Sequence, residues 1–154
     1  MPDTGLDNGI LTLICPHCGA QNRLPQARLE AGPKCGACHR PLFDGHPAEV
    51  DERGFDRHLA HDGVPLLVDV WAPWCGPCRA MAPAFARAAA RLEPRVRCLK
   101  LNADAAPSVS ARYQIRSIPT LLLIDRGILR ERAAGAMPED AIIRFAARQP
   151  GPSG

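Results

Sequence analysis

The sequence contains no long hydrophobic run. Among its 154 residues there is no stretch of about 18 consecutive apolar residues, the length that a membrane-spanning helix requires. The first ten residues, MPDTGLDNGI, also lack the basic segment and the apolar core of about 7–15 residues found in a secretory signal. We therefore expect a cytoplasmic protein that has no membrane partner.

An excess of charge of one sign is also missing. The chain has 19 Lys and Arg residues against 16 Asp and Glu residues, so its net charge is only +3. A nucleic-acid-binding surface usually needs basic residues gathered on one face, and here they are scattered along the chain. We expect no nucleic-acid partner. The hydrophobic content of 46% and charged content of 23% are those of a globular protein.

Cysteine, in contrast, is plentiful. Six of the seven cysteines form three C-x-x-C pairs: CPHC at 15–18, CGAC at 35–38 and CGPC at 75–78. In a protein without an export signal, a framework of structural disulfides is not expected, and such cysteines usually bind metal or do redox work. Because a C-x-x-C pair can do either, the surroundings of each pair must decide its chemistry.

The composition divides the chain into two parts. The first forty-odd residues hold four of the seven cysteines, with turn-forming residues around each pair and little helical periodicity. The stretch GILTLI (9–14) predicts a short strand, and DGHPAE (44–49) has the breakers of a linker. We predict an N-terminal module over residues 1–47, a larger domain over 48–150 and a flexible tail over 151–154.

From about residue 50 helical and strand patterns alternate. Helices are predicted over 51–63, 78–93, 106–115 and 138–149, and strands over 64–72, 95–104, 118–125 and 128–135. The last two strands flank the turn DRG, so they should form an antiparallel hairpin. This order predicts an α/β fold in which helices flank a central mixed sheet.

The central pair is placed for electron exchange. Cys75 follows an apolar strand and begins an amphipathic helix, whose N-terminus stabilises a thiolate. Cys75 is therefore predicted to be the exposed nucleophile, which attacks a substrate disulfide and forms a mixed disulfide. Cys78, one turn further along, should be the buried thiol that resolves this intermediate. Gly76 and Pro77 keep the two sulfurs close.

The segment LVDVWAPWCGPCRAMAP, followed downstream by SIPT, resembles the thioredoxin family, and the likeness covers roughly residues 49–149. The resemblance implies a thioredoxin fold and the reduction of protein disulfides. It implies that Ile118–Pro119 is a cis peptide that faces the active-site disulfide and holds the substrate backbone. It also places Gly135 on the substrate-facing surface, and pairs Lys100 with a buried acid, Asp69.

Asp69 supports this assignment on physical grounds. It lies in the middle of the apolar run LLVDV, where burial should raise the pKa of its carboxyl group and suit it to accept a proton from Cys78. In the alternative, Asp69 is satisfied by a partner and only adjusts the local pKa. Trp74, beside the nucleophile, fits a substrate surface better than packing. The predicted catalytic residues are Cys75, Cys78, Asp69 and Lys100, and the predicted substrate-binding residues are Trp74, Gly76, Pro77, Ile118, Pro119 and Gly135.

The two outer pairs have the spacing of a metal site. Sixteen residues separate CPHC from CGAC, as in a four-cysteine zinc ribbon with Cys15, Cys18, Cys35 and Cys38 as ligands. Four thiolates complete the coordination of zinc, so the site should be structural and should stabilise a module too small to bury its own core. Iron is not excluded by cysteine ligands alone. A redox role for Cys15 and Cys18 is an alternative.

The module and the WCGPC domain together resemble the zinc-binding bacterial thioredoxins, of the thioredoxin 2 type. This resemblance implies regeneration by thioredoxin reductase, an NADPH-dependent flavoprotein, and oxidised cytoplasmic proteins as substrates. Zinc is the one expected cofactor, and a monomer is the expected state. Three alternatives stay open: a disulfide donor or isomerase, a zinc-dependent binding protein, and an oxidative-stress sensor that loses zinc on oxidation.

The remaining cysteine and histidines are not predicted to take part. Cys98 alternates with its neighbours in a strand pattern and should be a small buried core residue. His17 and His39 lie beside cysteines, but four cysteines suffice for zinc, so both should face solvent. His58 and His61 are predicted to lie on the solvated surface of the first helix.

Overall fold

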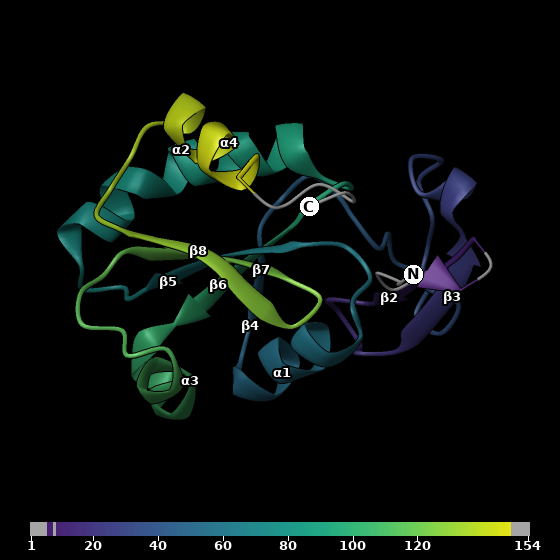
Figure 1. Ribbon diagram of the computed structural model, residues 1–154, viewed down its shortest axis with the longest axis horizontal. Coiled ribbons are helices and arrows are strands. Elements are labelled where there is room, and N and C mark those ends of the chain that lie inside the picture. The colour runs from purple at the N-terminus through teal and green to yellow at the C-terminus, as the bar shows by residue number, and fades with distance from the viewer. Residues whose placement is uncertain (1–5, 8, 149–154) are drawn as a thin grey trace.

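The chain forms two sheets of different size, shown in Figure 1 in a computed structural model that describes residues 6–7 and 9–148. The predicted tail, 151–154, lies outside these residues. Among the described residues no helix combines the length and the apolar character needed to cross a bilayer.

The larger sheet has five strands in the order β4-β6-β5-β7-β8. Its strands are β4 (Ala48–Val50), β5 (Leu66–Trp71), β6 (Arg97–Asn102), β7 (Thr120–Asp125) and β8 (Ile128–Ala134). The first three run parallel, whereas β7 and β8 pair antiparallel as the predicted hairpin. The central strands β5 and β7 are almost wholly buried because helices cover both faces, which agrees with their continuous apolar sequences.

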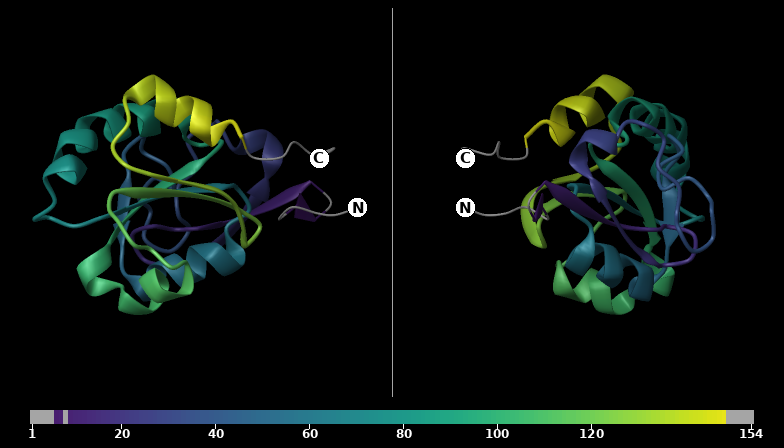
Figure 2. Two further views of the ribbon diagram at one scale, coloured as in Figure 1. Left: turned by 60° about the vertical axis from the view of Figure 1, so that its left-hand side comes forward. Right: turned by 90° about the vertical axis from the view of Figure 1, so that its right-hand side faces the viewer.

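Two helices lie on each face of this sheet (Figures 1 and 2). One face carries α1 (Glu52–His61) and α3 (Pro107–Arg112), and the other carries α2 (Gly76–Leu92) and α4 (Glu139–Ala146). The mixed sheet between two helical layers confirms the predicted α/β class. Short 3₁₀ turns, η1 (Gln26–Arg28) and η2 (Ala103–Ala105), complete the helical elements of the described chain.

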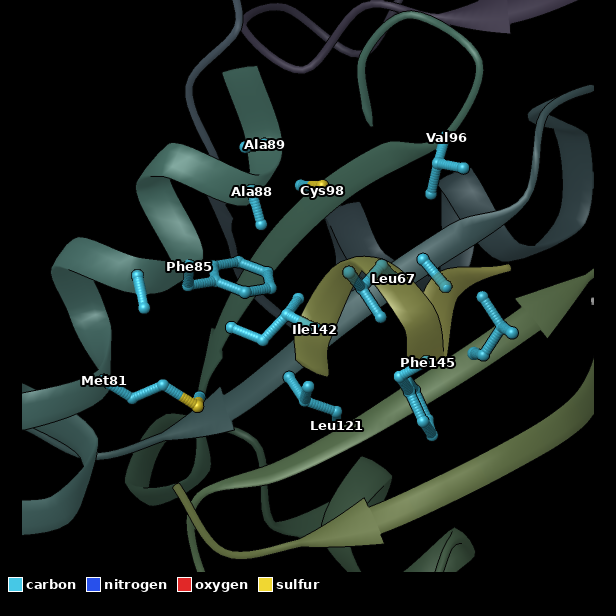
Figure 3. Packing of buried hydrophobic residues seen from close by; sticks show 13 residues of the cluster. Leu67, Met81, Phe85, Ala88, Ala89, Val96, Cys98, Leu121, Ile142 and Phe145 are labelled. Atoms are coloured by element: carbon cyan, nitrogen blue, oxygen red, sulfur yellow. The ribbon is translucent and has the colours of Figure 1, made fainter. Parts of the chain in front are cut away.

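The core between the sheet and the α2–α4 layer is apolar and closely packed (Figure 3). Phe85 from α2 and Phe145 from α4 point toward Leu67 of β5 and Leu121 of β7. Cys98 lies in the same cluster with no exposed surface, which confirms the prediction of a buried core residue. This packing holds β5 and the start of α2 in a rigid frame.

The smaller sheet belongs to the N-terminal module. It comprises β1 (Leu6–Asp7), β2 (Ile10–Ile14) and β3 (Gln21–Pro25), all antiparallel. The sequence predicted β2 but missed β3, whose polar sequence QNRLP has no apolar face. The core of the module is small, and it includes Val64 of the larger domain.

Strand β4 was also missed in the sequence. Its first two residues fall in the predicted linker 44–49, yet residues 48–50 pair with β6 and form one edge of the larger sheet. A three-residue strand is too short to show an alternating pattern. The chain therefore passes from the module into the edge of the larger sheet with little free linker.

The module and the β5–α2 turn lie at opposite ends of the larger domain. In Figure 1 the module is on the right, whereas the chain leaves β5 and enters α2 on the left, and Figure 2 agrees. The module contacts the end of the sheet where β6 begins, at Arg97. This arrangement separates the outer cysteine pairs from the central one.

Candidate active site and metal centre

The central cysteines lie at the N-terminus of α2. Cys75 is the N-cap residue of this helix, and its sulfur accepts a hydrogen bond of 3.2 Å from the backbone N–H of Cys78. The two cysteines form a disulfide with a Cα–Cα distance of 5.2 Å. Once the disulfide is reduced, the free N–H groups at this helix end favour a thiolate on Cys75.

The exposure predicted for Cys75 is wrong for this oxidised form. Only 4% of Cys75 and 2% of Cys78 is exposed. Cys75 is covered because it packs with Ala72 and Ile118 once its sulfur is bonded to Cys78. The exposed surface beside the disulfide comes from Trp74, which is 66% exposed.

A second loop, which contains Ile118 and Pro119, lies against the disulfide. The Ile118–Pro119 peptide bond is cis, which confirms the isomer implied by the resemblance. The carbonyl oxygen of Ile118 lies 3.7 Å from the sulfur of Cys75. Gly135 donates its N–H to the carbonyl of Pro119 over 2.8 Å, and its φ of +100° suits glycine. The structure therefore brings these three residues to the face of Cys75.

Trp74 has a partner that the sequence analysis missed. The indole Nε1–H of Trp74 donates a 2.8 Å hydrogen bond to Oδ2 of Asp104. Because β5 and β6 are parallel, their carboxyl ends meet at one edge of the sheet. Asp104 follows β6 at this edge, and the strand–helix–strand order predicted over residues 64–104 was the signal that could have pointed to it.

Asp69 is a buried carboxyl group without a hydrogen-bond partner among the described residues. Burial raises the pKa of Asp69 to about 7, and the positive charge of Lys100 opposes this rise. Lys100 lies opposite Asp69 in register on β6, but its Nζ is placed 4.2 Å from the centre of the Trp71 ring. Lys100 thus acts on Asp69 as a nearby charge rather than through a direct hydrogen bond.

The four outer cysteines come together at one point. Their sulfurs all lie within 4.8 Å of one another, with 3.7 Å between Cys15 and Cys38 and 3.6 Å between Cys18 and Cys35. A tetrahedral zinc site with Zn–S bonds of about 2.3 Å has sulfurs about 3.8 Å apart, so the geometry fits zinc.

The surroundings of these sulfurs also fit a metal-bound thiolate. Backbone N–H groups of His17 and Ala37 each donate to a cysteine sulfur over 3.3 Å, and such bonds stabilise negative charge on sulfur. The side chains of His17 and His39 are exposed, in agreement with their predicted solvent-facing positions.

His58 corrects another prediction. Whereas His61 is exposed as expected, His58 is only 2% exposed. Its Nδ1 lies 2.5 Å from Oδ2 of Asp62, which also accepts from Nε of Arg97 at 2.6 Å. His58 follows the buried Phe55 by three residues, so it lies on the inward face of α1, where it bonds Asp62 beneath the module. A charged residue, Arg97, inside a predicted central strand was the signal of a buried ion pair.

Two family descriptions match the chain. The Thioredoxin model matches residues 46–148, and a model described as Thioredoxin 2, N-terminal, matches residues 14–40. These ranges contain the CGPC pair and the four-cysteine cluster, respectively.

Curated relatives and solved structures point the same way. Thioredoxin C-3 of Corynebacterium nephridii is 40% identical over 82% of this chain and 87% of its own length. The chloroplastic M-type thioredoxin of Chlamydomonas reinhardtii is 36% identical over 77% of this chain and 92% of its own. A chloroplastic thioredoxin z structure has a TM-score of 0.61 and 26% identity, covering 67% of this chain and 93% of its own. With its active-site disulfide on a helix N-terminus and a zinc-ribbon cluster ahead of it, the chain belongs to the thioredoxin family, whose members are protein-disulfide oxidoreductases.

Proposed function

We propose that this thioredoxin reduces protein disulfides, with Cys75 as the nucleophile and Cys78 as the resolving thiol. The observation that carries these roles is the position of Cys75 as N-cap of α2, where its sulfur accepts the N–H of Cys78. A thiolate is most stable at this end of a helix. Cys78 lies one turn inside the helix, 5.2 Å from Cys75 between their Cα atoms, so its sulfur is placed to attack a sulfur bound to Cys75.

The proposed reaction has two exchange steps. The Cys75 thiolate attacks one sulfur of the substrate disulfide, and the other substrate sulfur leaves as a thiolate that takes up a proton. Cys78, once deprotonated, attacks the sulfur of Cys75 in the mixed disulfide. The second substrate sulfur leaves, the Cys75–Cys78 disulfide forms, and two electrons have passed to the substrate.

Asp69 is proposed to accept the proton of Cys78. Its pKa of about 7 allows the carboxylate to take a proton and to return it near neutral pH. Lys100 supports the ionised form of Asp69 through its charge. This role is that of a general base whose burial excludes bulk water.

The substrate surface is proposed to surround the disulfide. Trp74 offers an exposed aromatic face, Gly76 and Pro77 are exposed beside the sulfurs, and Gly135 is exposed near Pro119. An extended substrate segment lying across Ile118–Pro119 would present its disulfide to Cys75. The exposed residues around the disulfide form the proposed contact surface for protein substrates.

The catalytic cycle needs a reductant, and the N-terminal module needs a metal to fold. We infer that an NADPH-dependent thioredoxin reductase reduces the Cys75–Cys78 disulfide, that oxidised cytoplasmic proteins are the substrates and that the protein acts as a monomer. Cys15, Cys18, Cys35 and Cys38 would hold one zinc ion, which supplies structural cross-links to the module.

Trapping the mixed disulfide tests the two cysteine roles. Cys78→Ser, mixed with a small disulfide-bonded protein such as insulin, should accumulate a covalent complex on non-reducing gels because the second exchange step is blocked. Cys75→Ser should form none. Cys98→Ser, which removes a buried thiol, serves as the matched control and should turn over normally. A complex that forms with Cys75→Ser but not with Cys78→Ser would reverse the assignment.

A further inference from the structure

Arg97 joins the two parts of the molecule. It begins β6 and is only 1% exposed. Its Nε donates to Asp62 of its own domain, as described above. Its Nη1 donates to the carbonyl of Leu42 over 2.9 Å, and its Nη2 donates to the carbonyl of Ile14 over 3.0 Å. Two of the three guanidinium nitrogens are therefore satisfied by the backbone of the N-terminal module.

Asp62 reaches the same point of the module. Its carboxyl group is fully buried, and while Oδ2 binds Arg97 and His58, Oδ1 accepts the N–H of Ile14 over 3.1 Å. Both backbone polar groups of Ile14 are thus bonded by the larger domain. Close by, Gly63 donates its N–H to the carbonyl of Thr12 over 2.8 Å. The larger domain therefore contacts the module through backbone groups of β2.

The two carbonyls bonded by Arg97 depend on the metal site for their position. Ile14 directly precedes the ligand Cys15, and Leu42 packs in the small module core together with Cys15 and Cys35. A module with so small a core folds mainly through its metal. When the metal leaves, Arg97 and Asp62 lose the backbone groups that satisfy them.

Loss of these hydrogen bonds destabilises the larger domain. A buried ion pair is stable only when its remaining hydrogen-bonding groups are also satisfied. The guanidinium of Arg97 also stacks on the ring of Phe43, 4.1 Å from its centroid, so the module supplies packing as well. The stability of β6, which lies between β4 and β5 in the sheet, is therefore linked to the folded state of the module.

We propose that His58, Asp62 and Arg97 form a latch that couples zinc binding in the N-terminal module to the stability of the redox domain. The coupling is reciprocal: docking strengthens zinc binding by the same factor by which zinc stabilises the larger domain. Loss of zinc then loosens the catalytic domain from the end opposite its active site. The three residues act as positioning residues and take no part in disulfide exchange.

Unfolding of the larger domain and release of zinc from the module can be measured separately in the full-length protein. Both tryptophans of the chain, Trp71 and Trp74, lie in the larger domain, so their fluorescence reports its unfolding alone. A chromogenic chelator reports zinc release from the module, and a phosphine reductant keeps all thiols reduced. In the native protein, zinc removal should lower the midpoint temperature of the tryptophan transition by roughly 4 °C or more.

Arg97→Met tests the latch directly. This variant should make the tryptophan transition insensitive to zinc, and its zinc affinity in chelator competition should fall roughly 5–150-fold. Arg95→Met is the matched control: Arg95 is exposed, two residues earlier, and its ion pair with Glu30 of the module, at 3.7 Å, is exposed on both sides and therefore weak. It should keep the native zinc affinity and the native zinc dependence of unfolding.

A second variant keeps the proposal testable if Arg97→Met does not fold. Arg97→Lys keeps the charge beside Asp62 but has one nitrogen, which cannot also reach both carbonyls. It should weaken zinc binding and reduce the zinc dependence of unfolding. The proposal is overturned if zinc removal leaves the native tryptophan transition unmoved, or if either Arg97 variant folds and keeps the native zinc dependence.

Discussion

The buried carboxyl group of Asp69, which the proposed reaction uses as a base, lowers the stability of the folded protein near and above pH 7. Burial raises the pKa of this carboxyl from 3.8 to about 7, so the folded state binds a proton that the unfolded chain has released. The folded state therefore loses stability as pH rises from about 4 to 7. A shift of about 3 pKa units corresponds to about 4 kcal/mol, an order-of-magnitude figure.

Asp69→Asn should accordingly stabilise the protein above pH 7 and slow the resolving step. Urea unfolding at pH 8, followed by tryptophan fluorescence, should show a higher midpoint than the native protein, and the difference should shrink toward pH 4. Asp56→Asn, at an exposed position paired with Arg112, is the control and should show no such pH-dependent gain. A variant less stable than the native protein at pH 8 would contradict the argument.

At the scale of elements, the parallel pairing of β5 and β6 builds the substrate surface. The pairing brings Trp74, after β5, to Asp104 in the η2 turn after β6. Asp104→Ala removes the acceptor that orients the indole. Since one such hydrogen bond is worth about 1 kcal/mol, kcat/KM for insulin reduction should fall about fivefold.

The same measurement needs a control for general damage. Asp56→Ala breaks an exposed ion pair between α1 and α3 that involves neither the indole nor its acceptor, and it should leave kcat/KM unchanged. Thermal midpoints should be similar for both variants, because both carboxylates are exposed. An unchanged kcat/KM for Asp104→Ala would mean that the orientation of Trp74 does not matter for substrate binding.

At the scale of the whole molecule, the metal centre and the disulfide are held apart. Leu66, at the start of β5, pairs in register with Arg97, where the module docks, whereas Cys75 follows the other end of β5. Six residues at about 3.3 Å each separate these ends by about 20 Å. The screening length at physiological salt is only about 8 Å.

Zinc removal should therefore leave the reduction potential of Cys75–Cys78 nearly unchanged. Below the unfolding temperature, equilibration with glutathione buffers should give values for the zinc-loaded and zinc-free proteins that differ by less than about 30 mV, which equals about 1.4 kcal/mol. Loss of activity on zinc removal should appear only near the unfolding temperature. A larger shift of the potential at low temperature would mean that the module adjusts the disulfide directly.

Local patterns in the sequence were enough to predict the α/β class, the antiparallel hairpin and the grouping of four cysteines. Apolar runs such as the one around Val68 report burial, and C-x-x-C spacing reports a shared site, because each depends on residues close together in the chain. The cis Ile118–Pro119 peptide came from the family resemblance, and the acid Asp69 came both from that resemblance and from its place in an apolar run. Strands β3 and β4 were not predicted because β3 is polar and β4 is very short, so neither shows a clear alternation of apolar and polar residues.

The tertiary structure alone decided which distant groups meet. Arg97 reaches Asp62, Leu42 and Ile14 across 35, 55 and 83 residues of sequence, and no local pattern records such pairs. For the same reason His58 was assigned to the surface, although docking of the module buries it. The spacing and neighbours of the cysteines predicted which pairs share a site, whereas only folding places the N-terminal module on a buried charge at the end of the larger domain opposite the disulfide.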